Sequence, residues 1–460
     1  MTLNKLFKNP ILHQEEKWTP IKDFKRELKL REENKFRKVL TQLSASNIIK
    51  IEEEYIKFTF VGVMIIENSI LYCYPKYFKK FDYYNFKKVI QVIKKTNRSG
   101  DRELVQTSLF SNDSLNNLSL ILFFVEDYFE NGLYQTTHDT IETNGHGKIL
   151  WNKTIKNNLP IIKNDKPYYF EMFTKKRVDD YNNYFRLLHT IIVSECSKIL
   201  RITHLDDLFG ITTVPDLTDQ TLVDFDELNH ILKMIDKEKN VQFNTHKNEL
   251  LDKMKQYLMS EDTFATDSCL NIYGTTSFEV IWEKLCKVVF GDKLDKPIRN
   301  LSIDLVSKYD KNKKLIKLIK EPIWFIDYKK TKGKPFIPDL ITVYENNFLI
   351  FDAKYYNIKM NDDGVTGQPD LESITKQYMY ELAYREFINA HNLNVRNSFL
   401  FPMDGETSIN GYAKLEILEN LNLQNIYVIF VSANDLFDCY LKNSKSYNKV
   451  WREELFKKIV

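Results

Sequence analysis

Two aspartates and a lysine flank the strands of one predicted β-hairpin, and this feature constrains the fold most. Leu340–Tyr344 is apolar and rich in β-formers, and Phe348–Phe351 is fully apolar, so both segments predict buried strands. Asp339 stands directly before the first strand, and Asp352 and Lys354 follow the second. Three charged residues are therefore expected at one end of a buried hairpin.

The turn of this hairpin is predicted at Asn346–Asn347, because asparagine tolerates positive φ. A two-residue turn there places Lys354 opposite Asp339. Residues two positions apart share a strand face, so Asp352 joins Lys354 on that face. Opposed Cβ atoms lie roughly 5 Å apart and diagonal ones roughly 7–8 Å. The three charges should therefore form one cluster.

Such a cluster is typical of metal-assisted phosphodiester hydrolysis. Two close carboxylates provide the hard oxygen ligands that Mg²⁺ prefers, and a lysine beside them can orient or deprotonate a water or stabilise charge on a phosphate. The alternative is a strand that ends in solvent with an ordinary Asp–Lys pair. The Pro338–Asp339 start, the hairpin length and the Asp-x-Lys after four apolar residues favour the nuclease interpretation.

Composition limits the classes of protein. A length of 460 residues predicts two or three domains, and the five cysteines are scattered without metal or disulfide spacing. No apolar run approaches the ~20 residues of a membrane helix, and the N-terminus has no signal-peptide core. We expect a cytoplasmic protein without membrane contact.

Net charge is only +3, so any DNA-binding surface must be a local patch. Residues 308–334 carry ten lysines and form the most basic window. A strand predicted at Pro322–Tyr328 lies inside this window and should neighbour the hairpin. We hypothesise that four of these lysines line the approach of the scissile strand: Lys329, Lys330, Lys332 and Lys334. A solvated lysine-rich loop is the alternative.

Hydrophobic periodicity predicts an α/β (α+β) chain with three regions. Residues 1–108 form a small α+β domain, 109–266 a helix-rich middle domain, and 267–460 a mixed sheet flanked by helices. In the last region, Thr276–Glu279 fits a capping box before a helix. After the hairpin come a helix at Leu371–Ala390, strands at Ser398–Phe401 and Ile426–Val431, and two closing helices.

These motifs resemble the PD-(D/E)xK nuclease superfamily, and within it the LlaJI family of restriction endonucleases, whose relatives include the McrC nuclease subunit. The C-terminal resemblance covers about 190 residues, in the superfamily order of acidic helix, Asp at a strand start, D-x-K strand, and helix with an early Gln. The segments that carry it are Phe278–Glu279, Pro338–Asp339, Asp352–Tyr356 and Lys376–Tyr378, with a weaker N-terminal likeness at Val61–Val63, Tyr74–Lys76 and Gly147–Ile155.

The resemblance implies a role for each site residue. Asp339 and Asp352 would bind Mg²⁺ (or Mn²⁺), and Lys354 would activate or position the attacking water. Gln377 would lie at the site edge and orient water or backbone. Glu279 would be the helical acid and a further metal ligand. The second metal-binding acid is Asp rather than the commoner Glu, a variant that the superfamily allows.

The identity of the helical acid stays open. Glu283 lies one helical turn beyond Glu279 on the same flank, so Glu279 could serve only as a helix cap while Glu283 acts in the site.

The resemblance also implies a function and partners. LlaJI-like and McrC-like nucleases cleave double-stranded DNA in restriction–modification systems that defend against phage, beside a McrB-like AAA+ GTPase. This chain has no G-x-x-x-x-G-K-[ST] motif, so another polypeptide would bind the nucleotide. A homo-oligomer is possible in this class. Two alternatives stand: a repair or recombination nuclease with the same core, and a non-catalytic DNA-binding or assembly subunit.

Overall fold

A computed structural model describes residues 10–67, 69–98, 117–264, 270–326, 329–361, 364–442 and 444–460. The chain divides into two compact units. Of the described residues, the first unit contains 117–207 and 211–264, and the second contains those of 10–98, 208–210 and 270–460. The N-terminal and C-terminal regions expected from the sequence thus share one unit.

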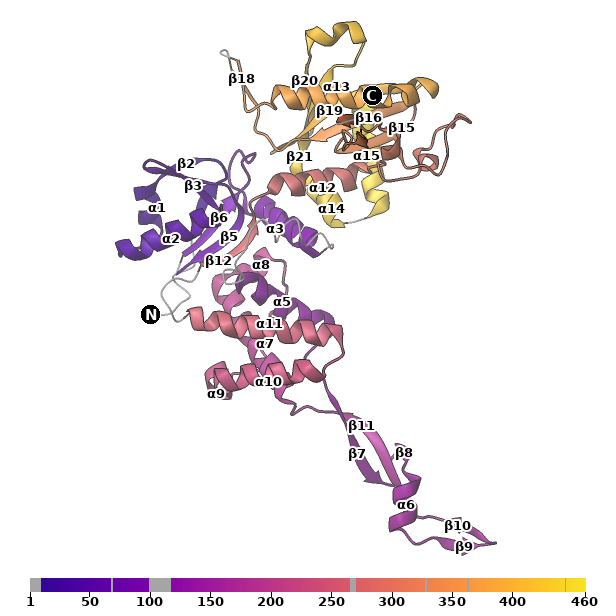
Figure 1. The fold of residues 1–460 in the computed structure, drawn as a ribbon. Helices are drawn as coiled ribbons and strands as arrows, with labels where there is room; N and C mark the ends of the chain where they lie inside the picture. The colour runs from indigo at the N-terminus through magenta and orange to yellow at the C-terminus, as the bar shows by residue number, and fades with distance from the viewer. Residues whose placement is uncertain are drawn as a thin grey trace. The chain divides into compact units, whose positions relative to one another are not determined.

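The first unit combines a helical bundle with a β-ribbon (Figure 1). Apolar faces of its long helices meet in a buried core, as the sequence periodicity predicts. The helices are α5 (Asn117–Asn131), α7 (Tyr184–Thr203), α10 (Leu228–Val241) and α11 (Thr245–Phe264), with the short α9 (Leu222–Phe225). The ribbon contains β7 (Thr137–Thr143), β8 (Lys148–Ile149), α6 (Trp151–Asn157), β9 (Ile161–Lys163), β10 (Lys166–Tyr168) and β11 (Phe173–Asp179). Among the described residues, no helix combines the length and apolar character that a bilayer crossing requires.

The N-terminal part of the second unit is built on a four-stranded sheet in the order β1-β6-β5-β12. Its strands are β1 (Ile11–Gln14), β5 (Val61–Ile66), β6 (Ser69–Tyr74) and β12 (Leu270–Thr275). β5 and β6 pair antiparallel, with Val63 opposite Tyr72. The last strand comes from far along the chain and pairs with β5 so that Gly62 lies opposite Gly274. A Cβ at Gly62 would lie 2.3 Å from the Tyr273 carbonyl oxygen, so this crossing needs glycine.

The C-terminal part contains a five-stranded mixed sheet in the order β15-β16-β19-β21-β20. β16 and β19, and β19 and β21, run parallel, whereas the two outer strands pair antiparallel. The strands are β15 (Leu340–Tyr344), β16 (Asn347–Ala353), β19 (Asn394–Met403), β20 (Ser408–Ala413) and β21 (Ile426–Ser432). This confirms the expected mixed α+β fold.

Helices cover both faces of this sheet, with α13 (Leu371–Ala390) on one side and α12 (Phe278–Phe290) on the other (Figure 1). α14 (Ala433–Lys442) and α15 (Lys445–Ile459) pack beside α12. Alternate residues of β16 point to opposite layers: Phe348 contacts the ring of Tyr384 on α13, whereas Phe351 contacts Phe290 on α12. Both layers that cover β16 are apolar, which explains why the residues of this strand from Phe348 to Phe351 are all hydrophobic.

Further elements of this unit surround the two sheets. They are β2 (Trp18–Pro20), α1 (Ile21–Glu27), α2 (Glu33–Ala45), β3 (Ile49–Glu52), β4 (Tyr55–Phe58), α3 (Tyr83–Arg98), β13 (Ile323–Ile326), β14 (Lys329–Lys332), β17 (Lys359–Asn361) and β18 (Gly364–Thr366). Of the expected strand at 322–328, residues 323–326 form β13, and 327–328 lie outside the described residues. Within the described ranges, β13 pairs with β14 in a two-stranded ribbon and not with the hairpin. That prediction of a neighbouring strand was wrong, because the lysines after the strand form its partner.

Candidate active site

The β15–β16 hairpin forms as expected, but its turn is displaced by one residue. Tyr344 pairs with Asn347, so the two-residue turn is Glu345–Asn346 and not Asn346–Asn347. Glu345 rather than an asparagine takes the positive φ, at 50°. The turn still has two residues, so each side chain of the hairpin lies on the face of the sheet that was predicted for it. The shifted register brings Asp352, instead of Lys354, opposite Asp339.

The charged residues of the motif meet at the end of this hairpin. Lys354 Nζ lies 2.9 Å from Asp352 Oδ2, and the Asp352 carboxylate is close enough to Asp339 to raise the pKa of that buried carboxyl group. The backbone N–H of Ala353 donates to Asp339 Oδ2 at 2.8 Å, which holds that carboxyl against the neighbouring strand. The structure therefore brings together the three residues that the spacing predicts.

The cluster of Asp339, Asp352 and Lys354 has more acidic than basic groups. Burial and the adjacent Asp352 carboxylate raise the pKa of Asp339 to about 8, and Glu283 contributes in the same direction. Burial disfavours the charged ammonium of Lys354, but the carboxylates of Asp352 and Asp339 outweigh it and raise the pKa of that lysine. Lys354 is thus a stable cation, and the acids beside it can accept more positive charge.

Helix α12 presents two acids to the same cavity, Glu279 and Glu283. Glu283 acts electrostatically on Asp339 and pairs with Lys287 one turn on, whereas Glu279 is exposed. The expected capping box does not form: the N-cap is Ser277, without a side-chain cap, and the Ser277 N–H donates to Thr275 Oγ1 at 3.0 Å. Of the two helical acids, Glu283 is therefore the one that acts on the pKa of Asp339.

Gln377 lies beneath the sheet instead of in the cavity lining. Its side chain is fully buried, and Nε2 donates to the main-chain oxygens of Ser398 (3.2 Å) and Ile350 (3.4 Å). Gln377 thus joins β16 to β19, and its contact on β16, Ile350, is two residues before Asp352 in the chain. These hydrogen bonds hold the backbone of two strands together, and a role for Gln377 in the site itself stays a prediction.

The four lysines assigned to DNA lie on or beside the exposed β13–β14 ribbon. Lys332 pairs with Glu321 at 3.0 Å, and Lys330 lies 5.6 Å from the centre of the Phe325 ring. None of the four lines the cavity that contains Asp339 and Lys354. Their contact with DNA stays a prediction.

We expect charge reversal to glutamate at these four lysines to weaken binding of every DNA sequence alike. Phosphate contacts position the protein without reading bases, and each lost contact reduces the slope of log affinity against log salt by about 0.9. Titrations of labelled duplexes at several salt concentrations measure both. Four reversals outside the ribbon, at exposed Lys308, Lys311, Lys313 and Lys317, control for net charge. Equal effects of the two sets would contradict a specific role for the ribbon.

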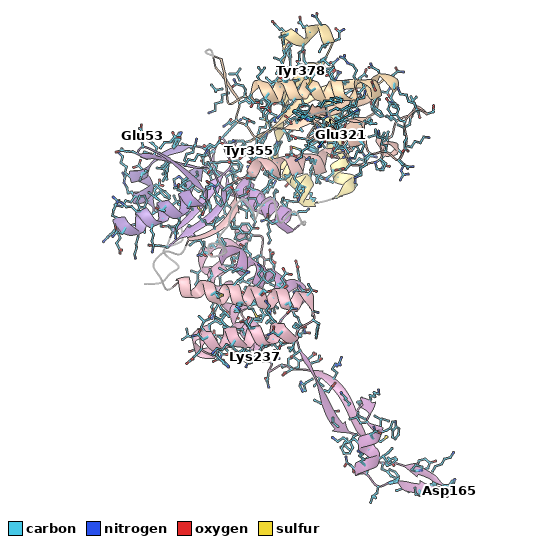
Figure 2. The ribbon with its side chains drawn as sticks, viewed as in Figure 1. Glu53, Asp165, Lys237, Glu321, Tyr355 and Tyr378 are labelled. Carbon is cyan, nitrogen blue, oxygen red and sulfur yellow. The ribbon has the colours of Figure 1, made fainter. Side chains whose placement is uncertain are left out.

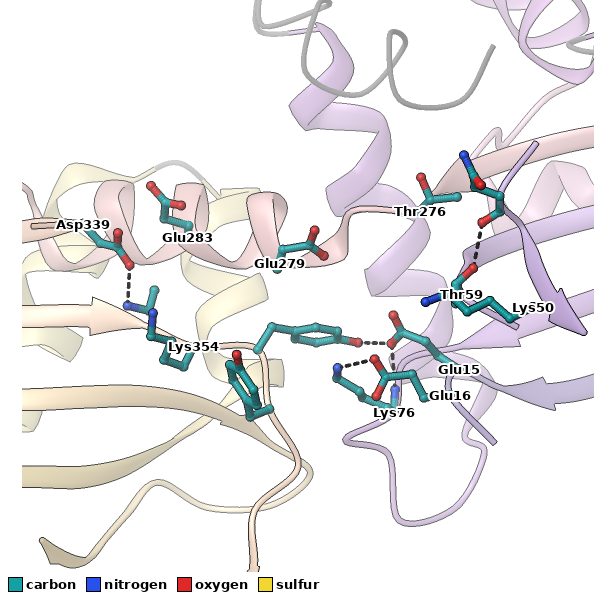
Figure 3. Close-up of a pocket in the computed structure, with 14 residues that line it drawn as sticks. Glu15, Glu16, Lys50, Thr59, Lys76, Thr276, Glu279, Glu283, Asp339 and Lys354 are labelled. Carbon is teal, nitrogen blue, oxygen red and sulfur yellow. Dashed lines mark hydrogen bonds and ion pairs between the residues drawn. The ribbon is translucent and has the colours of Figure 1, made fainter. Parts of the chain in front are cut away.

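The cavity has an opposite wall that the motif does not reveal (Figure 3). This cavity of about 700 Å³ is lined on one side by Glu279, Glu283, Asp339 and Lys354, and on the other by residues of the N-terminal part, including Glu15, Lys50 and Lys76. Tyr355, the residue after the D-x-K lysine, donates its hydroxyl hydrogen bond to buried Glu15. Among the sequence motifs that resemble the family, only Tyr74–Lys76 contains a residue of this N-terminal wall, namely Lys76.

Comparison with known proteins decides the family. A family model described as LlaJI restriction endonuclease matches residues 60–434. The chain belongs to the LlaJI restriction endonuclease family. This confirms the resemblance inferred from the motifs. A curated relative described as the type II restriction enzyme BsuMI component YdjA, from Bacillus subtilis (strain 168), is 26% identical over 403 residues, which span 84% of this chain and 81% of the relative.

Two solved assemblies from Thermococcus gammatolerans also align with this LlaJI-family chain. One is a half-complex from a tetradecameric assembly of McrB AAA+ hexamers with bound McrC; the match has a TM-score of 0.42 and 13% identity and covers 98% of this chain and 100% of that chain. The other is a McrBC complex, with a TM-score of 0.27 and 14% identity, covering 63% of this chain and 89% of that chain.

Proposed function

We propose that this chain is the DNA-cleaving component of a restriction system and hydrolyses phosphodiester bonds with Mg²⁺ (or Mn²⁺). The observation that carries the proposal is the contact of Asp339, Asp352 and Lys354 at the end of one hairpin, with Asp339 and Lys354 lining a cavity. Membership of a restriction endonuclease family supports the choice of DNA as substrate.

The residues present fit Mg²⁺ in a particular way. Within the described ranges, no three His, Cys, Asp or Glu side chains converge as a complete metal-binding set. Mg²⁺, however, is commonly bound through one or two carboxylates together with waters and substrate phosphates. Asp339 and Asp352 provide those two carboxylates, and the raised pKa of Asp339 reflects its burial first and then the negative charge of Asp352, both of which a bound cation would offset. Bound there, the metal would polarise the phosphate and lower the pKa of a water.

The chain's own residues supply orientation and charge. Lys354, kept protonated by its two acidic neighbours, contributes positive charge beside the phosphate and orients the attacking water. The Ala353 N–H fixes the Asp339 carboxyl, and Gln377 holds the strands on which these groups stand. Glu283 is the helical acid we assign to the site, because it is the one that influences Asp339.

This assignment predicts different effects for two matched substitutions on α12. Glu283→Gln should lower the cleavage rate at least about tenfold, since it removes an acid that influences the metal-binding carboxylates. Glu279→Gln should change the rate by less than about threefold. Glu279 is exposed, so solvent screens its charge and removing that charge has a smaller effect on the site than removing the charge of Glu283. Initial rates of plasmid nicking by the two variants, at saturating Mg²⁺, make the comparison. The reverse order would make Glu279 the active acid.

The decisive test of the function is Mg²⁺-dependent nicking of duplex DNA by the purified chain, alone and with a AAA+ protein encoded beside it. A nucleotide-binding partner remains a prediction from the family resemblance. Metal-dependent cleavage by either preparation supports the nuclease. DNA binding without cleavage in both would favour the non-catalytic subunit, and neighbouring repair genes without a methyltransferase gene would favour the repair nuclease.

A further inference from the structure

Lys76 lies where two hollows of the second unit adjoin. The first is the cavity that contains Asp339 and Lys354. The second, of about 810 Å³, shares Lys76 and three other lining residues with it and carries further cations, namely Lys17, Lys79 and Lys359. The two hollows therefore adjoin at Lys76, and beyond it the second is lined by these three lysines and one further acid, Asp404. This excess of positive charge suits a polyanionic strand longer than one phosphate.

The position of Lys76 is fixed relative to the nuclease motif. Its backbone N–H donates to Glu15 Oε2 at 3.1 Å, and its carbonyl accepts from Asn357 Nδ2 at 3.2 Å. Its ammonium nitrogen lies 4.6 Å from the ring centre of Tyr355, the residue directly after Lys354. Figure 2 labels Tyr355, and Figure 3 labels Lys76 and Lys354 in the close-up of the cavity. Because contacts on both sides hold it, Lys76 presents its charge at a defined distance from the candidate catalytic strand.

The ammonium of Lys76 has capacity for a second partner. Among the described residues it forms an ion pair with Glu16 Oε1 at 2.8 Å; the Lys76 side chain is 14% exposed and the Glu16 side chain 50%. A lysine ammonium carries three N–H donors, and Glu16 accepts from one of them. The neighbouring acid Glu15 is buried, and burial raises its pKa to about 7, so it repels an incoming anion less than an exposed carboxylate would.

We propose that Lys76 binds a backbone phosphate of the DNA beside the scissile one, so that the N-terminal part forms one wall of the DNA groove. The nuclease core would then be incomplete without this wall. The identity of the ligand as DNA rests on the proposed function.

The test measures DNA affinity in the full chain carrying Asp352→Asn, which prevents cleavage during the titration. Lys76→Met keeps the aliphatic stem over Tyr355 and removes the charge. It should weaken binding of a fluorescent duplex about three- to tenfold and reduce the salt slope by about 0.9. The matched control is Lys57→Met: that lysine also stacks on an aromatic ring, 4.6 Å from the centre of Trp18, but lines neither hollow. It should change neither quantity.

Glu16→Gln separates phosphate binding from a structural ion pair. It removes the carboxylate that competes for Lys76, so affinity should rise while the salt slope is kept. A loss equal to that of Lys76→Met would show that only the ion pair matters and would overturn the proposal, as would unchanged affinity and slope in Lys76→Met or no DNA binding by the parent. If Lys76→Met melts at a lower temperature than the parent, Glu16→Gln alone decides. Absence of cleavage by the unaltered chain would refute the nuclease function yet leave this affinity comparison valid.

Discussion

Substitution of Asp352 by alanine should lower DNA cleavage at least about 10³-fold, because loss of a carboxylate that we propose to bind the metal would remove several kcal/mol of transition-state stabilisation. Asp352 is 4% exposed at the end of β16, and its partners are Lys354 and Asp339 rather than the apolar core. Folding and metal-free DNA affinity should therefore change little. Removing one of two adjacent acids also relieves their repulsion.

Plasmid nicking with Mg²⁺, a thermal melt and a duplex titration measure the three quantities for Asp352→Ala. Asp438→Ala is the matched control, because Asp438 also pairs with a lysine, Lys88, at 2.8 Å, but on α14. That variant should retain cleavage. Activity of Asp352→Ala within tenfold of the parent would refute the metal site, whereas loss of soluble protein in this variant alone would indicate a structural role.

Asp339→Asn should stabilise the metal-free protein at neutral and alkaline pH. The folded-state pKa of Asp339 is raised from its ordinary 3.8 to about 8, so the folded protein binds more protons than the unfolded chain between these values. Stability consequently falls as pH rises through this window. An asparagine has no proton to lose, and its side-chain oxygen can still accept from the Ala353 N–H. Near pH 8 the gain should be on the order of a few kcal/mol.

Thermal melts in chelator from pH 4 to pH 9 test this, with the stability difference between variant and parent vanishing at the acid end, roughly at the ordinary carboxyl pKa. Added Mg²⁺ should stabilise the parent but not Asp339→Asn, because a ligand stabilises only the state that binds it. Asp295→Asn, at an exposed position, should match the parent at every pH. An Asp339→Asn variant that is less stable than the parent at pH 8 would contradict the electrostatic account of the site.

Local sequence was sufficient for the hairpin and for the composition of its charged end. Apolar runs on either side of a short polar turn specify two adjacent strands. Residues two positions apart keep Asp352 and Lys354 on one face, and a two-residue turn puts Asp339 on that face whether it falls at Asn346–Asn347 or at Glu345–Asn346. The apolar spacing of α12 and α13 likewise predicts the layers that cover the sheet. These features depend on residues that are close together in the sequence, so they can be predicted without knowledge of the tertiary structure.

The register and the opposite wall of the cavity depended on tertiary contacts. Asn347 is drawn into the ladder because it pairs with Asn394 of β19, and the Asn394 N–H donates to the Asn346 carbonyl at 2.8 Å. A neighbouring strand thus displaced the turn that asparagine propensity favoured. Likewise, Glu15 and Tyr355 are 340 residues apart in the chain. No periodicity joins positions so distant, since only the packing of the N-terminal part against the nuclease motif brings them into contact.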